Sequence, residues 1–115
     1  MSLEFVRNRL IVDGRVVARF RNRVQTALYV PENDTIAVIT DSGRYGHRNV
    51  WAYHGDGRAR WRVAPSGAKR EVGYDAYFFL GVYDATYFLA YTRNGLVAIH
   101  AGSGHAAPIH YRLPW

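Results

Sequence analysis

Cysteine is absent from this chain, which excludes disulfides, thiolate nucleophiles and zinc sites with cysteine ligands. Lysine is nearly absent, because Lys69 stands alone among 15 basic residues and the others are arginines. The longest apolar segment, residues 76–91, contains Asp84 and is shorter than the roughly 20 residues that a membrane-spanning helix needs. No amino-terminal stretch joins basic residues to an apolar run. We therefore expect a cytoplasmic protein with no signal peptide and no membrane partner.

Apolar and aromatic residues are abundant, at 49% and 15% of the chain. Tyr, Trp and Val favour β-strands, and 115 residues suffice for one domain with its own core. The net charge of +6 indicates either an acidic partner, which arginine binds bidentately, or a solubilising surface. Because no block of five or more like charges occurs, an acidic protein is favoured over nucleic acid.

Short alternating segments bounded by turn residues run along the whole chain. They predict about ten antiparallel strands and no helix, and hence an all-β fold. Thr35 to Thr40 is apolar on both faces and is expected to be a central strand. The loop expected near the end covers residues 101–107. The predicted strands cover residues 10–12, 15–20, 24–30, 35–40, 49–54, 58–63, 76–83, 86–92, 96–100 and 109–113.

The segment from Arg48 to Val63 is predicted to be a hairpin. Gly55-Asp56-Gly57 is expected to supply positive φ angles at its turn. The following strand alternates, so Arg58, Arg60 and Arg62 are expected to share one face as a basic strip. Such a strip either docks an acidic surface or protects a sheet edge from pairing. A second row of this kind would comprise Arg19, Arg21 and Arg23 if their strand continues.

Two parts of the chain look repeated. Residues 35–40 align with residues 87–92, and residues 51–54 align with residues 97–100. A period of about forty to fifty residues is typical of propeller blades. The alignment predicts two four-strand units, at residues 24–63 and 76–113. It also predicts a hairpin at residues 9–20, which would be the second half of an earlier unit.

The motif N-V-W-A-Y-x-x-D-G-x-x-x-W-x-V at residues 49–63 resembles two strands of a blade in quinoprotein-type (PQQ-like) β-propellers. Over residues 20–112 the chain also resembles a group of small uncharacterised bacterial proteins, which share R-N-V-x-x-Y-x-x-x-G-x-x-x-W and L-x-A-Y-x-x-x-G motifs. The resemblance implies propeller-like blades. His54 and His100 replace the usual Asp, however, and two and a half blades cannot close a ring. We therefore expect no quinone and no other cofactor, and a sandwich, an open barrel or an incomplete propeller.

Catalytic and metal-binding motifs are not recognisable in the sequence. The five histidines form no HxH or HxxxH pair, and the aspartates stand where Asp caps turns. The serines in Gly-rich loops lack a G-x-S-x-G elbow. We therefore expect neither an enzyme nor a metal site. The residues concerned are His47, His54, His100, His105 and His110, with Ser42, Ser66 and Ser103.

These observations favour a non-enzymatic interaction module that binds an acidic protein, as an inhibitor or immunity-type protein does. The binding surface is expected at the loops of residues 41–48 and 64–75. The alternatives are a module that binds a sugar or nucleotide and a self-assembling structural repeat, that is, a homo-oligomer. The expected partner-binding residues are Arg44, Tyr45, Arg48, Arg58, Arg60, Arg62, Arg70 and Tyr74.

Overall fold

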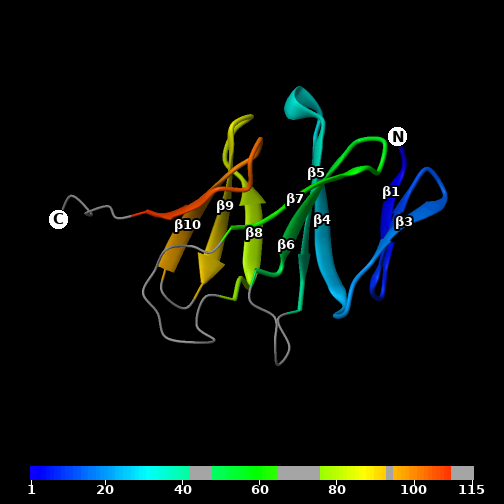
Figure 1. The fold of residues 1–115 in the computed structure, drawn as a ribbon, viewed down its shortest axis with the longest axis horizontal. Coiled ribbons are helices and arrows are strands. Elements are labelled where there is room, and N and C mark those ends of the chain that lie inside the picture. The colour runs from blue at the N-terminus through cyan, green and yellow to red at the C-terminus, as the bar shows by residue number, and fades with distance from the viewer. Residues whose placement is uncertain (42–47, 65–75, 93–94, 110–115) are drawn as a thin grey trace.

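The computed structural model describes residues 1–41, 48–64, 76–92 and 95–109. Figure 1 shows three antiparallel sheets side by side, with the amino-terminal sheet at one end and the carboxy-terminal sheet at the other. The all-β prediction is confirmed. In the described part of the chain none of the sheets closes into a barrel, which leaves an open sandwich or an incomplete propeller. None of the described residues belongs to a helix with the length and hydropathy needed to cross a membrane.

Each sheet is a meander of consecutive strands. The first sheet contains β1 (Leu3–Val6), β2 (Arg9–Val12) and β3 (Arg15–Arg19). The second contains β4 (Val24–Val30), β5 (Thr35–Thr40), β6 (Val50–His54) and β7 (Ala59–Arg62). The third contains β8 (Phe79–Val82), β9 (Tyr87–Thr92), β10 (Gly95–His100) and β11 (Ala106–Pro108). A 3-10 turn, η1 (Pro31–Asn33), joins β4 to β5.

Two strands differ from the sequence-based expectations. The sequence pattern predicts no strand at β1, and it predicts a loop where β11 lies. Ala107 pairs with Ala98 in β11, although Ala and Pro have low strand propensity, because pairing with the neighbouring strand outweighs that propensity. The strand expected at residues 109–113 is not tested, since residues 110–113 lie outside the described residues.

Strand β5 is buried on both faces, as its sequence predicts. Each of its six residues is buried. Ile36 and Val38 belong to the core shared with the first sheet, whereas Ala37 and Ile39 belong to the core shared with the third sheet. The second sheet is therefore the middle layer. Its strand β4 contacts both β1 of the first sheet and β8 of the third.

The two cores are apolar and separate. The buried side chains of the described residues include no charged group. The core between the first two sheets contains Leu10, Val12, Phe20, Val24, Ile36, Val38 and Tyr53. The core between the second and third sheets contains Val30, Ala37, Ile39, Val50, Val63, Tyr77, Leu80, Phe88, Ala90, Val97, Ile99, Ala101 and Ala106.

The repeat seen in the sequence matches the way the strands present their faces. In β9, Phe88 and Ala90 face the preceding sheet, just as Ile36 and Val38 of β5 do. Equivalent positions therefore point the same way in the second and third sheets. By the same register, Leu89 of the third sheet corresponds to Ala37 of the second.

Hydrogen bonds from buried or half-buried side chains fasten the second sheet to the third. Asn49, which is fully buried, donates through Nδ2 to the carbonyl oxygens of Thr40 and Tyr77, both at 2.7 Å. Its Oδ1 accepts from the backbone N–H of Tyr77 at 2.8 Å. The indole N–H of Trp61 donates to the carbonyl of Ala101 at 2.8 Å. These bonds fix the relative position of the two sheets more specifically than apolar contact does.

We expect Asn49→Asp to lower the free energy of unfolding by about 3 kcal/mol, because the carboxylate removes both Nδ2–H donors and places a charge in the core. Urea unfolding followed by tryptophan fluorescence measures this loss. The control is Gln25→Glu at an exposed amide that donates to Asp41, which should cost less than about 1 kcal/mol. Equal losses in the two variants would contradict the role of Asn49.

Candidate functional site

The predicted basic strip does not lie on one face. Arg58 precedes β7, which begins at Ala59. Tyr53 pairs with Ala59 and Ala52 with Trp61, so Arg60 is the extra residue of a β-bulge. A bulge interrupts the alternation of side chains, and for this reason the expectation of a single arginine face is wrong. At the turn, Gly57 has a positive φ of 94°, whereas Gly55 and Asp56 do not.

Arg60 forms hydrogen bonds within the protein that stabilise the fold. Its Nη1 donates to the hydroxyl of Thr35 at 2.7 Å and to the carbonyl of Asn33 at 3.1 Å. Thr35 is fully buried. The guanidinium therefore fastens the β6–β7 hairpin to the start of β5.

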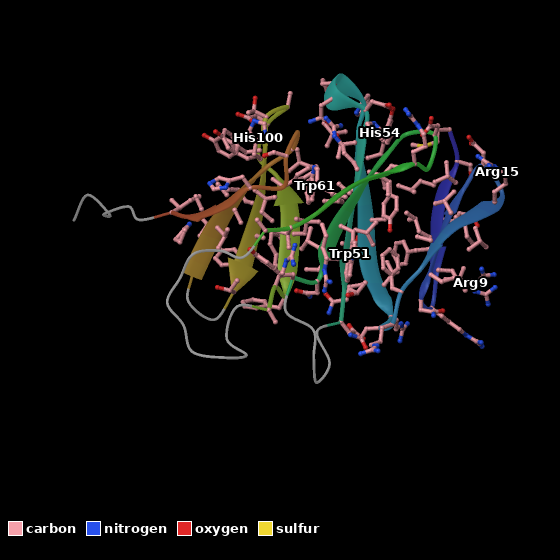
Figure 2. The ribbon with its side chains drawn as sticks, in the orientation of Figure 1. Arg9, Arg15, Trp51, His54, Trp61 and His100 are labelled. Carbon is pink, nitrogen blue, oxygen red and sulfur yellow. The ribbon has the colours of Figure 1, made fainter. Side chains whose placement is uncertain are left out.

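Arg62 and Arg48 are also held by intramolecular contacts. The Nε of Arg62 donates to the carbonyl of Arg48 at 2.8 Å, and the Nε of Arg48 donates to the carbonyl of Val63 at 2.7 Å. The guanidinium of Arg62 lies 4.8 Å from the centre of the Trp51 ring, a cation–π contact. Burial, and secondly the charge of Arg48, lower the pKa of Arg62. Figure 2 shows Trp51 and Trp61 on opposite sides of the middle sheet.

Arg58 faces solvent, with 73% of its side chain exposed, and Arg62 is also exposed although its guanidinium packs on Trp51. Arg58 forms an ion pair with Asp56 at 2.7 Å. Its backbone N–H, followed by its guanidinium, lowers the pKa of the Asp56 carboxyl. Strand β7 is an edge strand of its sheet, which agrees with the edge-protection interpretation. The other four expected residues, Arg44, Tyr45, Arg70 and Tyr74, lie outside the described residues.

The aspartates of the described turns act as local hydrogen-bond acceptors. Asp13 accepts from the backbone of Ser2, Asp34 from the Tyr29 hydroxyl, and Asp84 from the backbone of the following strand. The hydrogen bond from Tyr29 to Asp34 is the main reason that the pKa of Tyr29 is raised. Asp84 therefore performs the turn-capping role that its sequence position predicts, whereas Asp13 and Asp34 accept from residues outside their own turns.

One serine–histidine contact occurs within a turn. Nδ1 of His100 accepts the backbone N–H of Gly102 at 3.1 Å and lies 3.3 Å from the Ser103 hydroxyl. The Tyr87 ring packs edge-on against the imidazole at 5.6 Å. His54 and His100 end strands of two different sheets (Figure 2). Over residues 1–41, 48–64, 76–92 and 95–109, no group of three potential metal ligands comes together. His47, His110, Ser42 and Ser66 lie outside the described residues.

A basic surface that the sequence reasoning missed lies on the outward face of the first sheet, away from the middle sheet. Arg9 of β2 stands directly opposite Arg19 of β3. Because Leu10 and Val12 point into the core, these two arginines point outward, and Arg9 and Arg15 lie at this end of the molecule in Figure 2. Residues 7–23 contain six arginines and one aspartate. The row expected from Arg19, Arg21 and Arg23 does not form, because β3 ends at Arg19.

At the other end of the molecule, the outward face of the third sheet is aromatic and apolar. Two rows of rings cross the strands, Phe79 opposite Tyr91 and Tyr83 opposite Tyr87. Between them lies a row with smaller side chains, in which Gly81 pairs with Leu89 and Leu89 with Ala98. Leu89 and Ala98 of this middle row lie at the floor of a hollow of about 420 Å³. The hollow is lined by Tyr83, Tyr87, Leu89, Leu96, Ala98 and Ile109.

Comparisons with protein-family models, with curated proteins and with solved structures find no match to this chain. The resemblance to quinoprotein-type blades therefore stays a prediction.

We expect Arg60→Ala to lower the free energy of unfolding by about 2 kcal/mol, because the buried Thr35 hydroxyl loses its charged donor. Arg58→Ala is the matched control from the same hairpin and should leave the urea midpoint unchanged, since its ion pair is solvent-exposed. A larger effect of Arg58→Ala than of Arg60→Ala would contradict the division between structural and exposed arginines.

Proposed function

We propose that this chain is a non-enzymatic interaction module that binds an acidic protein through the outward face of its first sheet. The observation that carries the proposal is the direct pairing of Arg9 with Arg19 across β2 and β3. The loops at residues 41–48 and 64–75, most of which lie outside the described residues, stay predicted contributors.

The paired arginines favour an anionic partner. Like charges directly opposite each other on neighbouring strands destabilise a sheet. Within the described part of the chain, neither Arg9 nor Arg19 has an ion pair. A carboxylate between the two guanidiniums would accept hydrogen bonds from both and relieve their repulsion. The arginine pair does not stabilise the isolated fold, but it suits a surface that binds an anionic group.

The surroundings of the arginine pair favour a protein over a nucleic acid. Val6 and Val16 lie on the same face, with 47% and 38% of their surfaces exposed. Arginine among apolar side chains is typical of protein–protein interfaces. Glu4, opposite Ile11 on this face, would repel the phosphates of a nucleic acid. A phosphate-binding strip instead presents successive cations without an intervening acid.

Capture from the source cell's lysate at moderate salt tests the proposal. We expect the wild-type chain to retain an acidic protein, identified by mass spectrometry, and the double variant Arg9→Glu/Arg19→Glu to lose it at least about tenfold, because charge complementarity is reversed. Arg58→Glu is the matched control and should retain the partner. Retention by the double variant, or nucleic acid as the captured material, would contradict the proposal.

The single change Arg19→Glu should stabilise the free protein while it weakens partner capture. It replaces a repulsive cross-strand pair by an attractive one, worth about 0.5 kcal/mol. Thermal unfolding by circular dichroism measures the gain, and Arg15→Glu is the control for a general reduction of positive charge. If Arg19→Glu were no more stable than the wild type, the repulsion inferred from the strand register would be absent.

A further inference from the structure

The outward face of the third sheet is equivalent to a face that is buried in the second sheet. Leu89 and Tyr91 of β9 are equivalent in register to Ala37 and Ile39 of β5, which pack against the next sheet. In β9, however, nothing within the described chain covers this side, and Tyr91 is 42% exposed. An exposed apolar patch of this kind marks an interaction site more often than a solvated surface.

The shape of this face, a ridge beside a hollow, allows it to fit against the same face of a second copy. The Phe79 and Tyr91 rings, with centroids 5.8 Å apart, form a ridge beside the hollow over Leu89 and Ala98. Tyr83, 66% exposed, stands on the far side of the hollow. A second copy related by a two-fold axis that lies between the two sheets, parallel to the rows of rings, can place its ridge in this hollow and receive the first copy's ridge in its own.

The distribution of charge also favours a second copy of the chain as the partner of this face. The described residues that line the hollow are uncharged, which favours a partner with an uncharged surface, since an unpaired charge buried there would be costly. The other free sheet face carries Glu4, Arg9 and Arg19 and therefore does not match it. The uncharged aromatic face of a second copy does.

We propose that two copies of this chain associate through the outward faces of their third sheets, around a two-fold axis. A two-fold interface uses the same patch on both subunits and closes on itself. The third sheet has four strands of three to six residues and covers at most about 20 Å by 20 Å. This is a small interface, so we expect dissociation in the micromolar range. The pairing leaves the arginine face of the first sheet free on both copies.

Sedimentation velocity of the full chain between about 1 and 300 μM tests this proposal. We expect the mass to rise from the 13.1 kDa of one chain to twice that value and no further. Leu89→Arg in the hollow and Tyr91→Glu on the ridge should each stay monomeric over this range. Val16→Arg, on the outward face of the first sheet, is the matched control and should dimerise as the wild type does.

Several results would overturn the proposal. They are a wild type that stays monomeric, a mass that grows beyond two chains, and dimerisation that is lost in Val16→Arg but kept in Leu89→Arg. Circular dichroism establishes that each variant is folded, and Tyr91→Glu keeps the test decisive if Leu89→Arg does not fold. Failure here leaves partner capture by Arg9 and Arg19 untouched, because that activity lies on the other face.

Discussion

The burial of β5 on both faces is the constraint on which the rest of the structure depends. A strand with water on one side alternates apolar and polar residues, whereas Thr35 to Thr40 has no side that tolerates water. Sheets must therefore pack on both sides of it, and the chain supplies one before it and one after it. The hydrogen bonds of Asn49 and Trp61 then fix how the third sheet meets the second. Two separate apolar cores follow from this single layer.

Stacking three sheets leaves two outward faces, and the chain makes them different. The first sheet turns Arg9 and Arg19 outward, and the third turns Phe79 and Tyr91 outward. We propose that the first of these faces binds the carboxylates of a partner and that the second binds a copy of the chain. Because the two faces lie at opposite ends of the molecule, the two proposed interactions would not compete.

Much of the fold could be predicted from the sequence, because alternation and turn residues report strands directly. The central position of β5, the β6–β7 hairpin and the equivalence of β5 with β9 follow from such patterns. The site could not be predicted in the same way. The bulge at Arg60 depends on pairing with β6, and no local sequence pattern reveals it. The pairing of Arg9 with Arg19 requires the register of two strands, and β11 forms because β10 offers it a partner.

Native-state hydrogen exchange measures most directly whether the middle sheet organises the molecule. Amides that open only when the whole protein unfolds are found where two cores meet. We expect the amides of β5, which pairs with β4 on one side and β6 on the other, to exchange last and at the rate of global unfolding. The first and third sheets should open earlier. Slower exchange in β2 or in β9 and β10 than in β5 would contradict it.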